Sequence, residues 1–463
     1  MSTGNRLTRR SVLKAGGVAV VGATLAACGS TPTPAPAASS ESTAPPAAST
    51  GPTTITYWHL WSGRYADIQQ KLVDTFMKEH ADIKVDVLPV PSAIREKILT
   101  AVAAGQPPDV ATDGDCQTMA TAGALTDITP FVEKRGTDLK AIYPILLEGT
   151  RWNGKQWGFP ANAGVEAWYY NKDALSKAGV DTGSGPLDWA GPETWADWIE
   201  LNKKLIKLDN SGAIVESAAL PWAVRGIDVW FWTNGGKAFD AASGKVTINS
   251  PENVEALAWL VDYCKQVFGS VDKANEFQSA AGSAADGPFC TGTQAIVYGG
   301  NWDISTYHDW CASVKFGFFR FPKGPKGTDR YAYGASDWIY MPRGAKHPEQ
   351  AYTYIEWYVM KGATLWNKAG VDLTPIIKDK GLIPDGHVEI FGSEELAQKV
   401  NNWWLEGLEH SLSTYNFPAY GFMENELFRV RDLALAGDVT PSAALDDAQA
   451  SVERELEKTK LPA

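Results

Sequence analysis

The sequence has few cysteines and few histidines, and neither type is spaced for a metal site. Five cysteines occur among 463 residues, and no two of them form a CxxC pair, which argues against a zinc ribbon or a thioredoxin-like motif. The six histidines, at positions 59, 80, 308, 347, 387 and 410, are dispersed without metal-ligand spacing. We interpret them as isolated surface or core residues and expect no metal and no cofactor.

The sequence also lacks the common catalytic motifs. It contains no GxSxG elbow, HExxH pair, Walker loop or GxGxxG fingerprint. Asp113 and Asp115 are a candidate carboxylate pair, but two acids at i and i+2 on one loop do not face each other across a scissile bond. The stretch from Asp240 to Lys245 lacks the ligand ladder of a calcium loop, and a hairpin turn is expected there. These absences predict that the protein is not an enzyme.

No segment after residue 28 is long and apolar enough to span a membrane, but the N-terminus resembles an export signal. Thr8–Lys14 closely matches the twin-arginine signal, and the 13 uncharged residues Ala15–Ala27 fit a signal h-region. Leu25–Cys28 resembles the lipobox of bacterial lipoproteins, in which Cys28 would become the lipid-carrying N-terminus; a plain secretory peptide is the alternative. We expect a signal peptide over 1–28 and a flexible Ser/Thr/Pro/Ala tether over 29–53.

The balance of charge limits the partners. Residues 1–28 hold four basic side chains and no acidic one, so their removal leaves 38 basic against 54 acidic residues and a net charge of −16. This charge argues against nucleic acid and against an anionic lipid surface as partners. The remaining folded part, about 410 residues, exceeds the usual size of one core, which predicts two lobes.

Four cysteines remain after the signal, and an exported protein can form disulfides. They are Cys116, Cys264, Cys290 and Cys311. We favour a Cys290–Cys311 bridge, because these two residues would flank one strand–helix unit. Free, buried cysteines are the alternative.

Predicted strands alternate with predicted helices, which indicates an α/β fold with sheets covered on both faces. Hydrophobic periodicity predicts strands over 55–58, 83–88, 294–299 and 315–319, and helices over 67–80, 192–208, 251–268, 348–360 and 441–458. An Asn-Gly hairpin is expected over 152–157. In open α/β sheets, ligands bind outside the carboxyl ends of the strands.

Tryptophan is abundant, with 19 residues. Positions 195, 198, 259 and 357 lie inside helical patterns and are assigned to packing. Trp61, Trp302 and Trp338 lie at or beside strand ends with small or polar neighbours, where an indole offers an apolar face and one N–H donor. Because sugars present matching C–H faces and a rim of hydroxyls, we predict that these three contact a ligand, with packing between lobes as the alternative.

Several short motifs occur in the order and spacing of one family. They are Ile55–Trp58, Phe76–Val85, Ala104–Val110, Gly123–Thr129, Trp157–Pro160, Tyr169–Asp173, Pro192–Trp195, Gly292–Ile296 with Gly300–Trp302, and His347–Ala351. On these motifs, which are spread over nearly all of residues 54–463, the sequence resembles the bacterial extracellular solute-binding proteins, family 1. These are sugar-binding lipoproteins of ABC importers that resemble the maltose-binding protein.

The resemblance implies a two-lobed, periplasmic-binding-protein-like (class II) α/β fold with hinge segments and a central ligand cleft. We place the crossings near Pro160–Gly164, Tyr333–Trp338 and Gly370–Pro375. Lobe 1 would then hold 54–161 plus 338–370, and lobe 2 would hold 165–333 plus 375–463. Hinge closure would bury a mono- or oligosaccharide, and a monomer anchored by its lipid outside the cytoplasm would deliver it to the permease subunits.

The family's ligand contacts fall on five strand-end or late segments and on the second crossing. By position they are Trp61, Ser62 and Arg64; Asp113 and Asp115; Arg225 and Asp228; Trp302 and Asp303; Asp337 and Trp338; and Tyr420 in the segment 415–420. Asp113 stands where the maltose-binding protein has an aromatic residue, which argues against a maltodextrin ligand.

Two alternatives remain open. An exported carbohydrate-active enzyme, a lyase or a glycosidase, would also have a tryptophan-rich cleft with acidic pairs. The same fold could instead bind a polyamine, a peptide or an osmolyte, although Arg64 and Arg225 in the cleft argue against a polyamine.

Overall fold

The computed structural model describes residues 51–458 apart from 241–242, 281–286, 329, 332–333, 412–416 and 418. The predicted signal peptide with Cys28, and the tether up to residue 50, lie outside the described residues. Within the described part, no helix is both long enough and apolar enough to cross a membrane.

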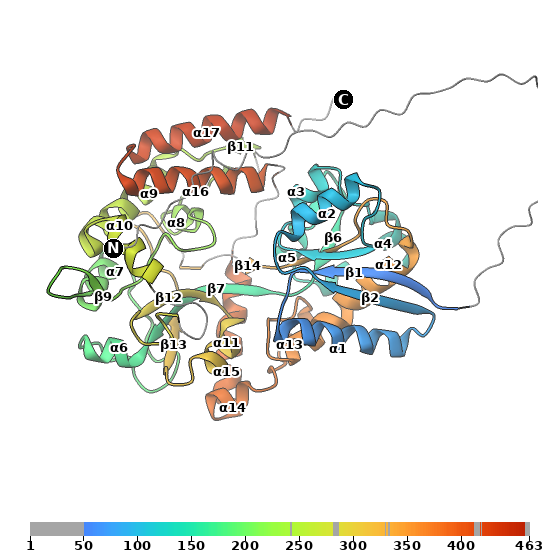
Figure 1. The fold of residues 1–463 in the computed structure, drawn as a ribbon, viewed down its shortest axis with the longest axis horizontal. Coiled ribbons are helices and arrows are strands. Elements are labelled where there is room, and N and C mark those ends of the chain that lie inside the picture. The colour runs from blue at the N-terminus through green and yellow to red at the C-terminus, as the bar shows by residue number, and fades with distance from the viewer. Residues whose placement is uncertain are drawn as a thin grey trace, which may run out of the picture. The chain divides into compact units, whose positions relative to one another are not determined.

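The first sheet has five strands in the order β2-β1-β3-β15-β6. They are β1 (Thr53–His59), β2 (Ile83–Pro89), β3 (Val110–Asp113), β6 (Gly158–Pro160) and β15 (Trp338–Tyr340). Its strands β1, β2 and β6 are labelled in Figure 1. β1 pairs in parallel with β2 and β3, whereas β15 pairs antiparallel with β3 and β6. Side chains of α1 (Arg64–Glu79) and α12 (Pro348–Trp357) form a core with one face of β1, and those of α2 (Ile94–Ala103) and α3 (Cys116–Thr121) form a core with the other.

The second sheet is antiparallel and is built around β7 (Gly164–Asn171). β12 (Ile296–Gly300) and β13 (Phe316–Phe319) flank β7, and the short β14 (Gly334–Ala335) pairs with its beginning. All eight residues of β7 are buried. Trp168 faces a core with Trp198 and Trp230, and Tyr169 faces another with Trp404 of α15 (Glu394–His410), so this sheet is also covered on both faces.

The other elements surround these sheets. They are the helices α4 (Thr129–Arg135), α5 (Pro144–Glu148), α6 (Lys172–Lys177), α7 (Trp195–Leu205), α8 (Asp228–Trp232), α9 (Pro251–Tyr263), α10 (Val271–Ala280), α11 (Asp303–Trp310), α13 (Ala363–Lys368), α14 (His387–Phe391), α16 (Tyr420–Ala436) and α17 (Pro441–Lys458), and the short strand pairs β4–β5 (Arg151–Trp152, Lys155–Gln156), β8–β9 (Lys207–Leu208, Ile214–Glu216) and β10–β11 (Phe239–Asp240, Lys245–Val246).

The predicted hairpins and most helices are confirmed, but the bounds of α7 are corrected. Asn153 and Gly154 take positive φ values of 50° and 72° between β4 and β5, as a type I′ turn requires. The helix predicted over 192–208 begins at Trp195, because Thr194 forms a capping box with Asp197. It ends at Leu205, since Lys207 and Leu208 pair with β9.

Three connecting segments run side by side between the part of the chain that forms the first sheet and the part that forms the second. The chain leaves β6, passes through 161–163 and enters β7; it later leaves β14, passes Ser336 and Asp337, and enters β15. Ala163 and Leu373 exchange backbone hydrogen bonds of 2.9 and 2.8 Å, which brings the third segment beside the first. These positions coincide with the predicted crossings, apart from Tyr333, which lies outside the described residues; the division into two lobes at these points stays a prediction.

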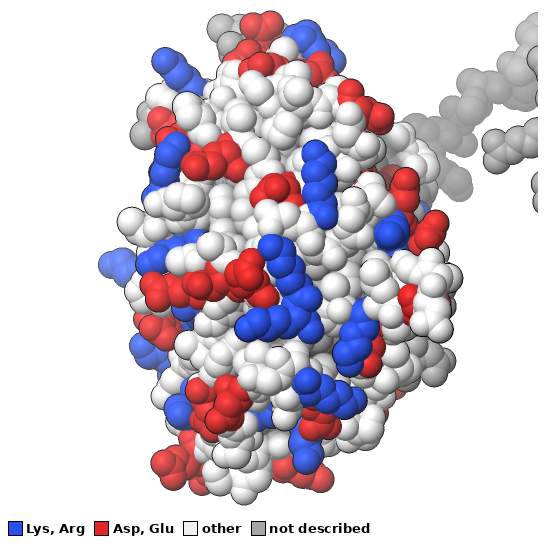
Figure 2. Space-filling view, turned by 90° about the vertical axis from the view of Figure 1, so that its left-hand side faces the viewer, with Lys and Arg blue, Asp and Glu red and all other residues white. Residues whose placement is uncertain are grey.

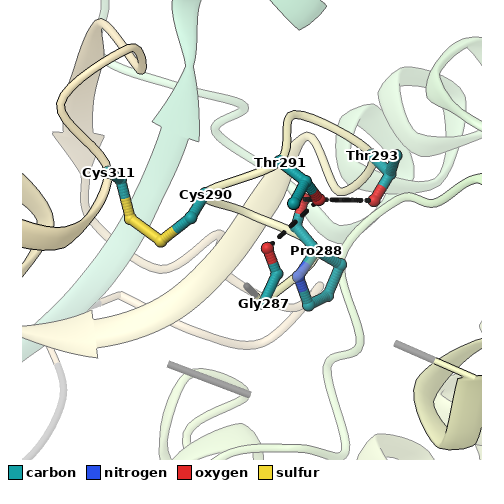
Figure 3. The surroundings of a disulfide bond; sticks show 6 residues. All are labelled: Gly287, Pro288, Cys290, Thr291, Thr293 and Cys311. Atoms are coloured by element: carbon teal, nitrogen blue, oxygen red, sulfur yellow. Dashed lines mark hydrogen bonds between the residues drawn. A yellow bond between two sulfur atoms is a disulfide. The ribbon is translucent and has the colours of Figure 1, made fainter. Parts of the chain in front are cut away.

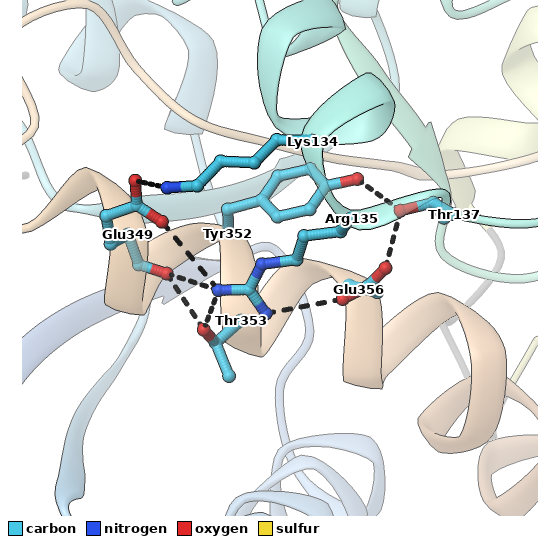
Figure 4. Close-up of polar contacts among 7 residues, drawn as sticks. All are labelled: Lys134, Arg135, Thr137, Glu349, Tyr352, Thr353 and Glu356. Atoms are coloured by element: carbon cyan, nitrogen blue, oxygen red, sulfur yellow. Dashed lines mark hydrogen bonds and ion pairs between the residues drawn. The ribbon is translucent and has the colours of Figure 1, made fainter.

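A polar network attaches α12, which follows β15, to the chain that precedes β6 (Figure 4). Arg135, the last residue of α4, donates to Thr353 Oγ1 at 2.7 Å and lies 3.4 Å from a carboxylate oxygen of Glu356. Thr137 Oγ1 lies 2.7 Å from the hydroxyl of Tyr352. The late segment 338–357 is therefore held on the first sheet, although it follows the second sheet in sequence.

The structure contains the favoured disulfide, between Cys290 and Cys311 (Figure 3). It connects the turn before β12 to the residue after α11, with 4.5 Å between the Cα atoms. Thr291 Oγ1 donates to the Gly287 carbonyl at 3.2 Å within that turn. The bridge therefore encloses the strand and helix between which Trp302 lies, while Cys116 and Cys264 are free and buried.

Charged side chains of both signs are interspersed on the face drawn in Figure 2. Exposed ion pairs such as Lys203–Glu200 and Lys207–Glu216 are typical of the surface. Each contributes little stability, because water screens both partners.

Candidate functional site

A cavity of about 230 Å³ lies where the three connecting segments run side by side. It is lined by Trp61, Tyr65, Asn162, Gly164, Arg225, Trp302, Ser336, Asp337, Val371 and Asp372. Trp61 and Tyr65 come from the end of β1 and the start of α1, whereas Arg225 and Trp302 come from loops that precede α8 and α11. The cavity is therefore lined by side chains from the part of the chain around each sheet and from the connecting segments.

Asn162 organises the polar side of the cavity. Its side-chain NH₂ group donates to Asp337 Oδ2 and to Asp372 Oδ2, each at 2.9 Å, and its Oδ1 accepts from the backbone N–H of Asp337 at 2.9 Å. Asp372 Oδ2 also accepts from Trp366 Nε1 at 2.7 Å. One amide thus fixes two carboxylates on the second and third connecting segments.

Burial perturbs the charges around the cavity. It raises the pKa of Asp372 to about 8 and raises that of Asp337 as well, although the Asn162 hydrogen bonds oppose both shifts. Burial would lower the pKa of Arg225, but Glu166, Tyr420, Tyr298 and Asp337 together more than offset it, so this pKa lies above its ordinary value. The Arg225 guanidinium lines the cavity and carries five N–H donors.

The two tryptophans are held in different ways. Trp61 is 8% exposed, and its ring lies 4.7 Å from that of Trp366. Trp302 is half-buried directly before α11, and its ring lies against Gly300, where a Cβ atom would collide with it. Asp303 Oδ2 accepts from Gly300 N–H at 2.9 Å, which fixes this turn, and burial raises the pKa of Asp303 to about 7.

Four predicted ligand residues meet at the cavity: Trp61, Arg225, Trp302 and Asp337. Each occupies a strand end, a loop before a helix or a connecting segment, as the sequence pattern indicated. Nothing in the arrangement assigns them catalytic geometry, since the two lining carboxylates share one amide partner.

The predicted carboxylates at the end of β3, Asp113 and Asp115, are not among the residues that line the cavity, although Gly114 between them lies beside Arg225 and Asp337. Asp113 accepts from Arg95 Nε at 3.0 Å, and Asp115 lies 3.5 Å from the same guanidinium. Asp115 also accepts from Thr118 N–H at 2.9 Å and so caps α3. In this structure both acids stabilise the loop and do not line the cavity.

The remaining predicted contacts also lie outside the cavity lining. Trp338 is 3% exposed and packs in the core between β15 and α2. Ser62 is exposed, and Arg64 donates to the Ala369 carbonyl at 3.1 Å. Asp303 acts within its own turn, and Asp228 and Tyr420 are the first residues of α8 and α16. Of the segment 415–420, residues 415, 416 and 418 lie outside the described residues.

Sequence reasoning missed four polar lining residues: Tyr65, Asn162, Ser336 and Asp372. Three of them lie in connecting segments whose positions were predicted. Because such segments run along the base of a cleft between two bodies, the polar side chains in 160–164, 333–338 and 370–375 were a usable signal.

A family model described as "Bacterial extracellular solute-binding protein" matches residues 62–364. The arabinooligosaccharide-binding protein of Bacillus subtilis (strain 168) is 24% identical over 424 residues, which cover 87% of this chain and 89% of that protein. The sn-glycerol-3-phosphate-binding periplasmic protein UgpB of Rhizobium meliloti (strain 1021) is 26% identical over 310 residues, covering 62% of this chain and 67% of the relative.

Solved structures of similar fold cover most of the chain. The structure described as CpMnBP1 with mannotriose bound has a TM-score of 0.73 and 24% identity, covering 86% of this chain and 100% of that one. Maltose-bound MalE3 of T. maritima has a TM-score of 0.66 and 20% identity, covering 87% and 100%. These similarities confirm the predicted fold class.

Proposed function

This chain belongs to the bacterial extracellular solute-binding protein family, and from that premise we propose that it captures a mono- or oligosaccharide by cleft closure and delivers it to the permease of an ABC importer. Members of this family bind and hand over a solute, so the expectation of a non-enzymatic protein is met. The sugar, the closure and the importer are the parts that we propose.

The cavity's chemistry supports a sugar. The faces of Trp61 and Trp302 suit the C–H faces of a sugar ring, and the carboxylates of Asp337 and Asp372 accept hydrogen bonds while Arg225 donates them. A hydroxyl both donates and accepts, so a polyhydroxylated ligand satisfies all of these groups. A ligand without hydroxyls would leave buried polar groups unpaired, which costs roughly 1–3 kcal/mol for each group.

The size of the cavity and the ligands named for similar proteins also support a sugar as the ligand. At about 230 Å³, the cavity lies below the roughly 300–1,000 Å³ of pockets for drug-sized ligands. It suits a single sugar ring or one end of an oligosaccharide. The proteins similar to this chain include one named for arabinooligosaccharide and structures that contain mannotriose and maltose.

A glycerol phosphate is the second candidate, because the Arg225 guanidinium lines the cavity and similar proteins are named for sn-glycerol-3-phosphate. Asp337 in its ionised form opposes an anion in the same cavity, whereas Asp372, whose pKa burial raises to about 8, is mostly protonated at neutral pH. The balance of lining charges therefore favours a neutral sugar.

The test is a calorimetric titration against arabinotriose, mannotriose, maltotriose, sn-glycerol-3-phosphate, spermidine, a tripeptide and betaine. We expect micromolar binding of at least one sugar, which corresponds to about −8 kcal/mol, and recovery of that sugar unchanged after overnight incubation. Binding of the phosphate or of spermidine without any sugar would contradict the proposal, and turnover of a sugar would favour the enzyme alternative.

The proposed closure uses the predicted lobes, 54–161 plus 338–370 and 165–333 plus 375–463, moving about the three connecting segments. Small-angle scattering should show a smaller radius of gyration when the sugar identified by titration is added. An unchanged radius at saturation would contradict closure.

We also propose that export removes residues 1–27 by the twin-arginine route and leaves Cys28 as a lipid-carrying N-terminus that anchors the protein outside the cytoplasm. The support is the order of the twin-arginine motif, the h-region and the lipobox. Cys28→Ser should move the protein from the membrane fraction to the soluble extracytoplasmic fraction. Continued membrane retention of this variant would contradict the anchor.

A further inference from the structure

Arg64 connects the helix that packs on the first sheet with the helix that follows β12 of the second sheet, and it does not line the cavity. It begins α1, which packs on the first sheet, and its guanidinium lies 3.6 Å from Asp309 Oδ2 on α11, which follows β12 of the second sheet. The same guanidinium donates to the carbonyl of Ala369 at 3.1 Å. Neither Arg64 nor Asp309 lines the cavity.

Two further contacts connect α11 to the first sheet's side. The hydroxyls of Tyr65 and Thr306 lie 2.8 Å apart, and Ser305 Oγ donates to the Gly370 carbonyl at 2.7 Å. Since Tyr65 lines the cavity, this contact lies directly beside the ligand space, and the Arg64–Asp309 pair lies one turn of α11 beyond it.

We propose that Arg64, Asp309 and Thr306 form a clasp that holds α1 against α11, raises the closed fraction of the empty protein and slows the release of a bound sugar without touching it. The inference rests on the proposed capture by closure. A contact across the cleft can shift an opening equilibrium only by the free energy it has in one form and lacks in the other. The clasp contacts exist only while the two helices adjoin, so their whole free energy counts toward closure.

The expected effect is modest, because the side chains of Arg64 and Asp309 are 46% and 49% exposed. Loss of one exposed ion pair should lower the closed-to-open ratio by about 1.5- to fivefold. The partly buried Tyr65–Thr306 hydrogen bond should contribute about two- to tenfold. The two effects need not multiply, since the contacts share one helix.

The test is a pair of spin labels on the empty protein, one at Lys71→Cys on α1 and one at Lys399→Cys on α15. Both lysines are exposed, and Cys116 and Cys264, the free cysteines among the described residues, are buried. Electron double resonance should show a short-distance population in the labelled wild type. Asp309→Asn and Arg64→Gln should each reduce the ratio of short to long distances about 1.5- to fivefold, and Thr306→Val should reduce it about two- to tenfold.

The controls separate the clasp from a general loss of charge. Arg64→Gln leaves intact the 3.3 Å contact between Asp309 and His308, and the swap Arg64→Asp with Asp309→Arg should restore most of the short population. The matched control is Asp86→Asn, which breaks the 3.0 Å Lys84–Asp86 pair of similar exposure within β2; it should leave the distances unchanged. Raising NaCl from 20 to 500 mM should reduce the short population in the wild type and not in Asp309→Asn.

Several results would overturn the clasp. They are a wild type without the short population, equal distances in the wild type and Asp309→Asn, and an equal shift in Asp86→Asn. In a separate arm, dissociation of mannotriose followed by stopped-flow fluorescence should be faster in Asp309→Asn. If the wild type binds neither mannotriose nor any other sugar, the proposed function fails, while the label distances still decide on the clasp.

Discussion

Replacing Trp302 by alanine should weaken sugar binding far more than it weakens the fold. Trp302 lines the cavity, is only half-buried and belongs to none of the hydrophobic cores of the described residues. Its deletion therefore removes a ligand surface without opening a hole in packed structure. The melting temperature of the empty variant should remain close to that of the wild type.

The loss of affinity follows from the area of one indole face. A buried aromatic side chain covers roughly 150–250 Å², and stacking on one face accounts for about a third of that area. At roughly 25 cal/mol per Å² this amounts to about 1.3–2 kcal/mol. Since about 1.4 kcal/mol is tenfold in an equilibrium constant, the dissociation constant should rise about ten- to thirtyfold.

The assay is calorimetric titration with the tightest sugar from the panel, together with thermal melting of the empty protein. Trp310, at the other end of α11, is 54% exposed and lies outside the cavity, so Trp310→Ala is the matched control and should bind normally. Trp198→Ala is the opposite control, because this fully buried tryptophan should cost about 3–5 kcal/mol of stability. Unchanged affinity in Trp302→Ala, or a melting loss comparable with that of Trp198→Ala, would refute the reasoning.

Three further predictions use the same protein. Gly300→Ala places a Cβ against the Trp302 ring and should weaken sugar binding by displacing the indole; binding equal to that of the wild type would show that the ring has room to move. The pKa of Asp372 is raised by burial to about 8, so its contribution to stability is complete below the unfolded pKa of about 4 and is lost as pH rises through 8. Asp372→Asn should therefore melt at a higher temperature than the wild type at pH 8.5 and at a similar temperature at pH 5. An equal difference in melting temperature at both pH values would contradict this prediction. The Cys290–Cys311 bridge spans 21 residues and should stabilise the fold by about 3 kcal/mol, so a reductant should lower the melting temperature of the wild type but not that of Cys290→Ser/Cys311→Ser.

Local signals were sufficient for much of the fold. The alternation of strands and helices, the Asn-Gly turn and the buried tryptophans of α7 follow from periodicity and turn chemistry within a few residues. The start of α7 was misplaced because Pro192 suggested a first turn, whereas the capping box of Thr194 and Asp197 decided the boundary. A cap is a pair of reciprocal hydrogen bonds, and it outweighs the weak preference of proline for a first turn.

The candidate site was only partly predictable, for a physical reason. Trp61 and Trp302 follow strands and could be placed by rule, but Trp338, three residues past β14, lies inside the next strand and is buried. Asp113 ends β3 and Asp115 follows it, as the rule requires, yet Arg95 of α2 pairs with both. Whether a polar side chain faces a ligand or a neighbouring side chain depends on contacts between distant segments, which periodicity does not report.

Arg64 illustrates the same limit. Its position after the first strand indicated a ligand contact, but the side chain reaches Asp309, 245 positions later in the sequence, and the carbonyl of Ala369. Asn162 is the opposite case, since a lone asparagine in a connecting segment carries no motif. Its role emerges only when Asp337 and Asp372 converge on its amide.

The most direct test of the account is a crystal structure of the protein with the sugar that binds most tightly in the titration. We expect one sugar ring in the cavity, with a face against Trp302 or Trp61 and hydroxyls within hydrogen-bond distance of Asp337, Asp372 and Arg225. A sugar bound elsewhere on the protein, with this cavity filled only by water, would contradict it.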